Sequence, residues 1–183
     1  MNDISDDTLI AASQGNAEAF EAVYKAASGL VYNVALRIVN NREDAQEVTQ
    51  EVFLIVYDKL KTFRFESSFK TWVYRITANY AINWAKKESR IRRKTVEYDD
   101  TQMSGAPQEE PEDEESKVQN VQAAQKLLDA LPPDQRACVV LRNLEGLSYQ
   151  EIADTLKINI NTVRSRLNRA REKLLTLQKK VVV

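Results

Sequence analysis

The side chains best suited to a chemical task in this sequence are arginines near its C-terminal end. Arg164, Arg166, Arg169 and Arg171 recur on a segment with helical periodicity. A guanidinium can donate two hydrogen bonds to O6 and N7 of guanine, and an asparagine can pair with adenine. Because a short basic helix fits the major groove of duplex DNA, the segment predicts a DNA-reading helix.

The side chains of this predicted helix are expected to divide into two groups. The group that points away from the packed side is expected to reach the bases, and it comprises Thr162, Arg164, Ser165, Asn168, Arg169 and Lys173. The other group, Ser148, Asn161 and Arg166, is better placed for phosphates, which fix register without reading sequence. The alternative is a solvated basic face on an ordinary helical bundle.

The elements that would position this helix form a helix-turn-helix. Pro132 and Pro133 end one predicted helix, and Gly146 is expected to end the next in a left-handed conformation. Ser148 and Glu151 have the spacing of a capping box for the third helix, and Asn161 is expected to cap the fourth. The expected buried positions of the motif are Ile152, Ala153, Leu156, Ile158, Ile160 and Val163.

A second constellation lies between residues 63 and 94, on a helix expected to begin near Ser67 or Ser68. Exposed aromatic rings beside cations suit unpaired bases, which stack on a ring while the backbone meets positive charge. Flipping a base out of a duplex also needs a pocket of this kind. The candidate residues are Trp72, Tyr74, Arg75, Asn79, Asn83 and Lys86. The alternatives are that Trp72 is core and that the basic tail, residues 90–94, is a solvated charge run.

The first part of the chain also reads as helices. Apolar spacing predicts one helix through Leu9 and Tyr24 and a second through Leu30 and Ile38, with a break at Asn40 and Asn41. A further helix starting near Asp44 carries an acidic stripe opposite its apolar face. In an isolated helix such a stripe is simply the solvent-exposed side of an amphipathic helix.

Charge is segregated along the chain, although the 26 basic and 27 acidic residues leave a net charge of only −1. Residues 61–96 carry a net charge of +8, residues 97–116 carry 9 acids and no base, and residues 140–183 carry +5. The acidic stretch has no periodicity and contains Gly105, Pro107 and Pro111, which is typical of a flexible linker. We therefore predict an all-α fold of two small helical domains, residues 1–96 and 117–183, joined by an acidic linker over 97–116.

Composition excludes several classes of function. With no histidine and one cysteine, the chain cannot form a zinc site or a Cys-His or Ser-His catalytic pair, and no metal or other cofactor is expected. Cys138 lies in an apolar stretch and is expected to be a buried hydrophobic side chain. No apolar run is long enough to cross a bilayer and the N-terminus has no signal peptide, so a cytoplasmic location is expected.

Together these segments resemble a bacterial RNA polymerase sigma factor of the extracytoplasmic-function (ECF) type, from about residue 8 to residue 175 outside the linker. The resemblance rests on the order and spacing of the segments 44–53 (DAQEVTQEVF), 69–79 (FKTWVYRITAN), 131–133 (LPP), 146–153 (GLSYQEIA), 162–166 (TVRSR) and 169–171 (RAR). Two positions differ from the usual family pattern, since Lys157 and Asn161 stand where glycine is common. Asn168 replaces an aromatic of some relatives.

The resemblance implies a role for each segment in a factor that is not itself an enzyme. Core RNA polymerase would be bound through Asp44, Glu47, Gln50, Glu51 and Phe53. The 72–87 helix would capture melted minus-10 bases, the arginine helix would read duplex minus-35 DNA, and the acidic linker would thread polymerase channels. The resemblance also implies an anti-sigma factor as a further partner.

Two other functions stay open at the level of sequence. A stand-alone helix-turn-helix regulator would need a dimer interface for two half-sites, and residues 1–95 do not resemble a dimerisation or ligand domain. A magnesium-dependent nuclease would have to use Asp99, Asp100 and the glutamates of the acidic stretch, where no predicted structure positions them.

Overall fold

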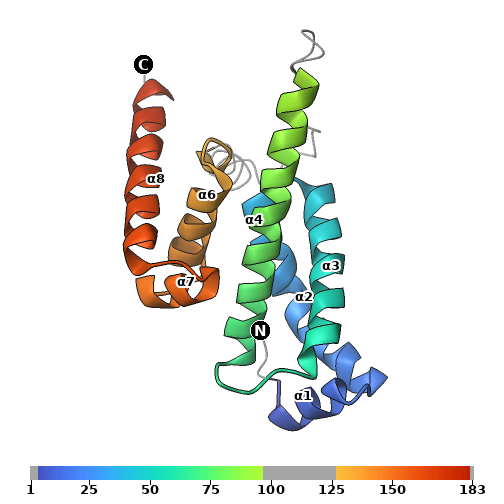
Figure 1. Ribbon diagram of the computed structural model, residues 1–183. Coiled ribbons are helices and arrows are strands. Elements are labelled where there is room, and N and C mark those ends of the chain that lie inside the picture. Colours follow the sequence, from blue (N-terminus) through green and yellow to red (C-terminus); the bar gives the residue numbers. More distant parts are fainter. Residues whose placement is uncertain (1–3, 97–126, 182–183) are drawn as a thin grey trace, which may run out of the picture.

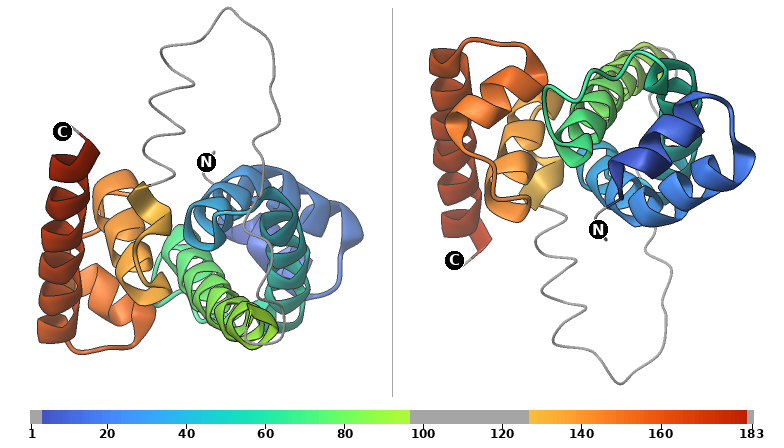
Figure 2. Two further views of the ribbon diagram at one scale, coloured as in Figure 1. Left: turned by 90° about the horizontal axis from the view of Figure 1, so that it is seen from above. Right: turned by 90° about the horizontal axis from the view of Figure 1, so that it is seen from below.

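A computed structural model describes residues 4–96 and 127–181, and all regular structure in those ranges is helical. Four helices, α1 to α4, form one bundle, and a second bundle packs along α4 (Figures 1 and 2). The helices are α1 Asp6–Ser13, α2 Ala17–Val39, α3 Arg42–Leu60, α4 Phe69–Val96, α6 Pro133–Val139, the π-helical turn η1 Val140–Leu144, α7 Tyr149–Leu156 and α8 Ile160–Val181. The predicted all-α class is confirmed. The predicted linker lies outside the described residues, and the domain boundaries stay predictions.

The first helical break differs from the sequence prediction. Gly15 takes a φ of 90°, and Asn16 then caps α2 by accepting a hydrogen bond from the Ala19 amide at 2.8 Å. From there α2 continues through Gly29 to Val39 as one helix, so the predicted division before Leu30 is wrong. Burial of its apolar side against α3 and α4 outweighs the cost of an interior glycine, which is about 1 kcal/mol.

Short polar side chains shape the connections to α3 and α4. Asn40 takes a left-handed conformation at the end of α2, and Asn41 caps α3, which confirms the predicted break. Ser68 caps α4 by accepting a hydrogen bond from the Thr71 amide at 3.1 Å, as its position predicts. The core between α2, α3 and α4 is made of fully buried aliphatic side chains, among them Val23, Val31, Val34, Val52, Val56 and Val73.

The second bundle begins at Pro133, which occupies the first turn of α6, where its missing amide hydrogen leaves no acceptor unpaired. The turn after α6 is wider than an α-helix, because the Glu145 amide donates to the Val140 carbonyl five residues earlier, at 3.2 Å. Gly146 then adopts a φ of 75°, as predicted. The predicted packing side of the motif is confirmed at Ile152 and Val163, which are fully buried.

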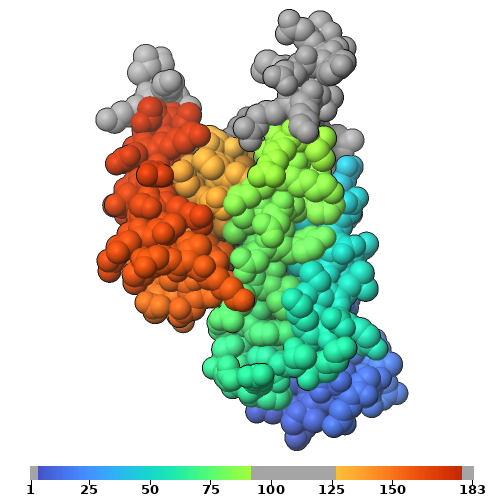
Figure 3. Space-filling model, in the orientation of Figure 1, coloured from blue at the N-terminus to red at the C-terminus, as the bar shows by residue number. Residues whose placement is uncertain are grey.

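The two bundles share a continuous core. Ala137, Cys138 and Leu141 of the second bundle are fully buried in the same cluster as residues of α2 and α4. The space-filling view shows the second bundle lying directly against the side of α4 (Figure 3). One long face of α4 is therefore covered by α6 and α7.

Candidate nucleic-acid interface

Local hydrogen bonds fix the turn between α7 and α8. The Ser148 hydroxyl accepts from the Glu151 amide at 3.2 Å, and the Glu151 carboxylate accepts from the Ser148 amide at 2.7 Å, so the capping box is confirmed. Through these bonds Ser148 lowers the pKa of Glu151. Lys157 ends α7 in a left-handed conformation, with a φ of 53°.

The cap of α8 lies two residues before the predicted one. Asn159 Oδ1 accepts a hydrogen bond from the Asn161 amide at 2.8 Å, so the prediction that Asn161 caps the helix is wrong. The helix begins earlier, at Ile160, and Asn161 is already inside its first turn. Its side chain instead accepts a 3.0 Å hydrogen bond from Arg164 Nη1, which orients the guanidinium.

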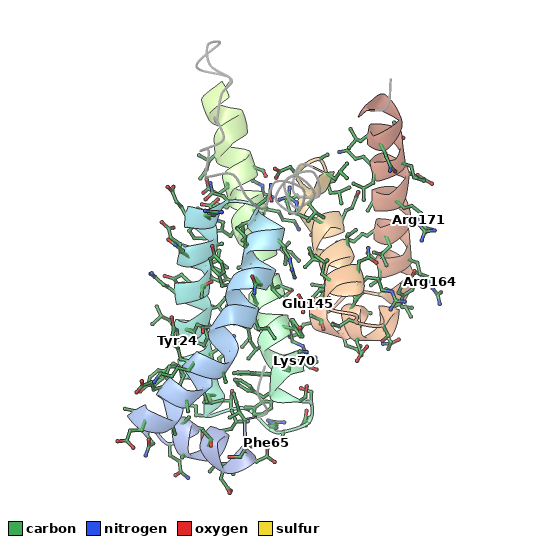
Figure 4. All side chains as sticks on the ribbon, turned by 180° about the vertical axis from the view of Figure 1, so that it is seen from behind. Tyr24, Phe65, Lys70, Glu145, Arg164 and Arg171 are labelled. Atoms are coloured by element: carbon green, nitrogen blue, oxygen red, sulfur yellow. The ribbon has the colours of Figure 1, made fainter. Side chains whose placement is uncertain are left out.

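The outer side of α8 presents the predicted DNA-reading side chains. Thr162 is half-buried, and the exposed members of the set are Arg164, Ser165, Asn168, Arg169 and Lys173. Arg164 and Arg171 project from α8 on the side away from the first bundle (Figure 4). A helix that displays arginine and asparagine at this spacing can place several donors along the edges of base pairs.

Arg166 lies on a different side of α8 from these residues. Its Nη2 atom is 3.6 Å from Asp134 of α6, and its side chain is only 23% exposed. Burial raises the pKa of the nearby Cys138 thiol, and the charge of Arg166 opposes that shift. Arg166 was predicted to contact a phosphate. In this arrangement its side chain is not free to do so, because it pairs with Asp134 and helps to hold α8 against α6.

Four aromatic rings cluster at the start of α4. Trp72 is half-buried, and its ring centroid lies 5.1 Å from that of Phe63 and 5.8 Å from that of Phe69. The Phe65 ring lies tilted against that of Phe63, with the centroids 4.7 Å apart; Phe65 is 44% exposed and has a left-handed φ of 57°. A bulky residue held in that conformation costs about 1–2 kcal/mol, and such strain is often found at functional sites.

Three of these rings, Phe63, Phe65 and Phe69, border an open pocket of about 350 Å³ beside the N-terminus of α4, whereas Trp72 does not line it. Its polar rim includes Ser67, Ser68 and the ammonium-bearing Lys70. Phe65 and Lys70 both lie toward the end of the molecule where α4 begins (Figure 4). Phe63, Phe65 and Phe69 were not among the binding residues expected from the sequence, although Phe69 begins the motif 69–79. Their clustering around Trp72 could have been suspected from three phenylalanines just before a tryptophan.

Tyr74 is not an exposed aromatic, as the sequence suggested, but a buried one. It is 3% exposed, and its hydroxyl donates a short hydrogen bond to the carboxylate of Glu145. Burial, and then the Glu145 carboxylate, raise the pKa of Tyr74 above its ordinary value. The prediction of exposure failed because the second bundle covers this side of α4, which the periodicity of α4 alone does not reveal.

Three other candidates on α4 also face the second bundle. Asn79 Nδ2 donates to the Thr155 carbonyl of α7 at 3.0 Å, and Lys86 Nζ lies 2.8 Å from Asp134 of α6. Arg75 borders a groove between α4 and α7 of about 580 Å³, whose rim includes Glu66, Glu151 and Asp154. Asn83 alone of the set is exposed and lies near Lys87 and Arg90 in a shallow hollow.

The acidic stripe of α3 is largely exposed. Glu47, Gln50 and Glu51 face solvent, whereas Asp44 is half-buried in the first turn of the helix. Burial, and then the neighbouring Glu51 carboxylate, raise the pKa of Tyr80 on α4.

Phe53 does not share this exposed face, contrary to the expectation for a direct contact residue. It is 6% exposed, and its ring lies 4.5 Å from that of Tyr24. The exposed apolar residues next to the stripe are instead Leu54 and Tyr57, at 64% and 56% exposure. Sequence reasoning missed both, although helical spacing from Gln50 to Leu54 to Tyr57 places them on the same face.

Among the described residues, 4–96 and 127–181, no three side chains of Asp, Glu, Cys or His gather as metal ligands would. Asp99 and Asp100, on which the nuclease alternative depended, lie outside the described residues. In the same ranges no helix combines the length and apolarity needed to span a membrane.

Comparison with known families and proteins gives two kinds of match. Residues 23–91 match the family model described as Sigma-70 region 2, and residues 122–174 match the one described as Sigma-70, region 4. The chain is 33% identical over 176 residues to the ECF RNA polymerase sigma-E factor of Haemophilus influenzae, covering 92% of this chain and 93% of that protein. Against the protein of the same name from Escherichia coli K12, identity is 34%, with 92% of each chain covered.

Another relative is longer than this chain. The ECF RNA polymerase sigma factor SigE of Mycolicibacterium smegmatis is 38% identical over 146 residues, which span 79% of this chain but 55% of that protein. Among solved structures, the sigma factor RpoE of Bartonella quintana, in complex with the anti-sigma factor NepR, has a TM-score of 0.66 at 24% identity, covering 87% of this chain and 96% of that one. CnrH in complex with the cytosolic domain of CnrY has a TM-score of 0.65 at 23% identity, with coverages of 94% and 96%. These two likenesses concern the fold.

Proposed function

Because this chain belongs to the ECF group of RNA polymerase sigma factors, whose members direct promoter-specific transcription, we propose how its surfaces divide that work. The outer side of α8 reads duplex minus-35 DNA. The start of α4 and its aromatic pocket capture melted minus-10 bases, and the exposed face of α3 binds core RNA polymerase. The chain supplies binding and positioning, and no bond is made or broken by its own side chains.

The observation that carries the minus-35 assignment is the exposed row on α8. Arg164, Asn168 and Arg169 point to solvent from a helix whose start is fixed by the capped turn at Ser148 and Asn159. A helix held by a second helix in this way enters the major groove with its N-terminal residues at the base edges. Each good bidentate contact is worth about 1–3 kcal/mol of discrimination between bases.

The aromatic pocket supports the assignment of minus-10 capture. An extruded base can stack on an exposed ring such as Phe65, while Lys70 and the hydroxyls of Ser67 and Ser68 meet the backbone. Stacking on an aromatic ring contributes about 1–3 kcal/mol per base. Opening of the duplex is then thermal melting that single-strand binding traps.

The face of α3 has the composition of a protein-binding surface. Exposed Leu54 and Tyr57 form an apolar centre, and Glu47, Gln50 and Glu51 provide a polar, negatively charged margin. We assign this face to core polymerase. The buried Phe53 packs against Tyr24 beneath the face and holds α3 against α2. An anti-sigma factor is a further expected partner, since the solved relative RpoE is found with one. Work with RNA polymerase also supports the expected cytoplasmic location.

The proposal is tested by run-off transcription with core polymerase on promoters from the source genome. Transcripts are expected only when the protein is added, and the double variant Arg164→Ala, Arg169→Ala is expected to abolish them while still binding core polymerase. Lys25→Ala, which removes an exposed cation from α2, is the matched control and is expected to leave transcription unchanged.

A different result would favour the stand-alone regulator. In that case the protein neither binds core polymerase nor supports initiation, yet retards duplex DNA by itself. Leu54→Glu separates the two functions further, because it is expected to weaken polymerase binding without changing the affinity of the free protein for duplex DNA.

A further inference from the structure

The side chain of Arg164 is held by a neighbour on its own helix. Its Nη1 atom donates a hydrogen bond to Asn161 Oδ1 at 3.0 Å, one turn earlier on α8. Both residues are exposed, and Arg164 projects from α8 on the side away from the first bundle (Figure 4). The pair therefore lies on the surface that the proposed function assigns to duplex DNA.

Asn161 is a firm support because the backbone around it is fixed. Its amide donates to Asn159 Oδ1 at 2.8 Å. The carbonyl oxygen of Asn159 accepts from the amides of Thr162 and Val163, at 2.9 and 3.2 Å. Val163 is fully buried, so this first turn of α8 is anchored in the core of the second bundle. The acceptor that holds Arg164 thus has a defined position relative to the whole helix-turn-helix.

The hydrogen bond leaves most of the Arg164 guanidinium free. A guanidinium has five N–H donors, and Asn161 takes one of the two on Nη1. The Nε and Nη2 donors lie along another edge of the plane and remain available for O6 and N7 of guanine. Asn161 therefore orients the guanidinium without blocking the pair of donors that a bidentate contact needs.

The same bond limits what Asn161 can do at a base. An asparagine that reads adenine accepts from N6 through its side-chain oxygen and donates to N7 through its amide. The oxygen of Asn161 already accepts from a cation, which makes it a poorer acceptor for adenine. Its amide hydrogens are left, and they suit a phosphate oxygen, which carries no sequence information.

The charge of the partner also separates Arg164 from the next arginine on α8. Arg166 faces the carboxylate of Asp134 at 3.6 Å, which neutralises the cation that it holds. A carboxylate beside Arg164 would in addition repel the phosphates of DNA. The amide of Asn161 is neutral, so it orients Arg164 while leaving the full positive charge for the nucleic acid.

We propose that Asn161 is a positioning residue for base readout, which holds the Arg164 guanidinium in one orientation so that this cation selects guanine in the major groove instead of pairing with the nearest phosphate. The inference rests on the proposed function in assigning the outer side of α8 to duplex DNA. It adds which side chain sets the selectivity of that surface.

The expected effect is modest because the pair is exposed to solvent. Ordering a long side chain before binding removes part of the entropy cost of its contact with DNA. We expect loss of the Asn161 acceptor to weaken duplex binding about fivefold, which corresponds to about 1 kcal/mol.

The experiment introduces Asn161→Ala into wild type and into the variant Arg164→Ala. Alanine favours a helix, so the fold is expected to survive, and circular dichroism checks the helix content. The matched control is Gln178→Ala, which removes an exposed amide near the other end of α8. The probe is a labelled promoter duplex on which core polymerase gives a transcript only with this protein. Fluorescence anisotropy measures its binding by the protein–polymerase complex.

Asn161→Ala is expected to weaken duplex binding about fivefold when Arg164 is present and by less than about twofold when it is absent. Each guanine of the minus-35 duplex is then replaced in turn by 7-deazaguanine, which lacks the N7 acceptor. The guanine contacted by Arg164 is the one whose replacement weakens wild type but not Arg164→Ala. Asn161→Ala should lose most of the sensitivity at that guanine, whereas Gln178→Ala should match wild type.

A second measurement needs no DNA. Nuclear magnetic resonance of the isotope-labelled full-length protein gives the rate at which each guanidinium rotates about its Nε–Cζ bond. Rotation in Arg164 is expected to be slower than in the exposed Arg171 of the same helix. In Asn161→Ala the two rates should become equal.

Two results would overturn the inference. If Asn161→Ala changes duplex binding equally in both backgrounds, or in neither, Asn161 does not act through Arg164. If Arg164 rotates as fast as Arg171 in wild type, Asn161 does not hold the guanidinium. A failure of the proposed function is seen separately, as wild type that gives no transcript with core polymerase. The rotation rates then still decide whether Asn161 holds Arg164.

Discussion

Arg136 Nη1 of α6 donates a 2.9 Å hydrogen bond to the carbonyl oxygen of Ile38, in the last turn of α2. The carbonyls of a last helical turn have no partner within the helix, so this cation satisfies one of them and complements the helix dipole. Arg136 is 7% exposed and also donates to the Leu131 and Asp129 carbonyls, at 3.2 Å each. It therefore joins the end of α2 to the start of the second bundle.

Replacement of Arg136 is expected to destabilise the protein strongly. Arg136→Ala leaves three carbonyls without this donor, and we expect a loss of about 2–4 kcal/mol in the free energy of unfolding. Urea unfolding followed by circular dichroism measures the change. Arg171→Ala, an exposed arginine of α8, serves as the control and is expected to change stability by less than about 0.5 kcal/mol. Equal effects of the two substitutions would contradict the structural role of Arg136.

Two arginines two residues apart on α8 are expected to behave differently. Arg164 is exposed, so Arg164→Ala should weaken binding of duplex promoter DNA by about 1–3 kcal/mol, with little effect on folding. Arg166 pairs with Asp134, so Arg166→Ala should lower the melting temperature and reduce duplex affinity less. Electrophoretic mobility shift measures the duplex affinity of both variants, and thermal unfolding measures their melting temperatures. A larger loss of DNA affinity for Arg166→Ala would reverse the assignment.

The aromatic pocket is expected to act on single-stranded DNA only. Phe65→Ala should weaken binding of a non-template minus-10 oligonucleotide by the protein–polymerase complex, by about 1–3 kcal/mol for one stacked base. Duplex minus-35 binding should be unchanged. Tyr149→Ala is the control, because Tyr149 is also an exposed aromatic (36%) but lies at the start of α7 and does not line the pocket. An equal loss of affinity for the oligonucleotide in both variants would contradict a role of the pocket in single-strand binding.

Lys157 offers a test of backbone strain in the turn. A residue with a side chain at a φ of 53° is less stable there than glycine, so Lys157→Gly is expected to stabilise the fold by up to about 1 kcal/mol. Lys173→Gly, in the middle of α8, is the opposite case and should destabilise by about 1 kcal/mol. The midpoints of chemical denaturation of the two variants should therefore shift in opposite directions relative to wild type. Shifts of the same sign would show that the backbone at Lys157 is not strained.

The stabilisation that the Ser148–Glu151 capping box provides should depend on pH. The Ser148 hydrogen bonds lower the pKa of Glu151 in the folded state, so this contribution to stability is fully present above the ordinary glutamate pKa. It is lost as the pH falls through the lowered, folded pKa. Ser148→Ala is expected to cost about 1 kcal/mol near neutral pH, and the difference from wild type should shrink in acid.

Unfolding at pH 6 and at about pH 3.5 measures this change. In the variant Glu151→Gln nothing titrates at this position, so the cost of adding Ser148→Ala to it should not vary with pH. A difference between wild type and Ser148→Ala that stays constant in acid would show that Glu151 is not coupled to the cap.

The features that the sequence predicts well are local ones. The break at Asn40 and Asn41, the Ser68 cap and the capping box at Ser148 depend on residues within four positions of one another, and all three are confirmed. Each is a case in which a side chain satisfies a backbone group of its own neighbourhood. The family was also visible, because its motifs are short runs with fixed spacing.

The features that the sequence did not reveal depend on contacts between residues that are far apart in the chain. The periodicity of α4 separates an apolar side from a polar side, yet Tyr74 on that helix is buried by Glu145, which is 71 residues later in the chain. Helical spacing likewise cannot tell that Arg166 turns toward Asp134. The predicted division before Leu30 failed for a similar reason, since burial of α2 against α3 and α4 keeps it one helix through Gly29.

The wide turn at Val140–Leu144 holds one residue more than an α-helix would need over the same rise. Removing any one residue there would let α6 continue as a regular helix. Everything downstream would then rotate by about 100° about the helix axis, and Glu145 would leave both Tyr74 and Arg37. The length of the chain between Cys138 and Glu145 thus specifies the arrangement of the two bundles as much as the identity of residue 145 does. Deletion of the exposed Asn143 would therefore change how the two bundles meet, although the buried Leu141 and the interface residue Glu145 would both be kept.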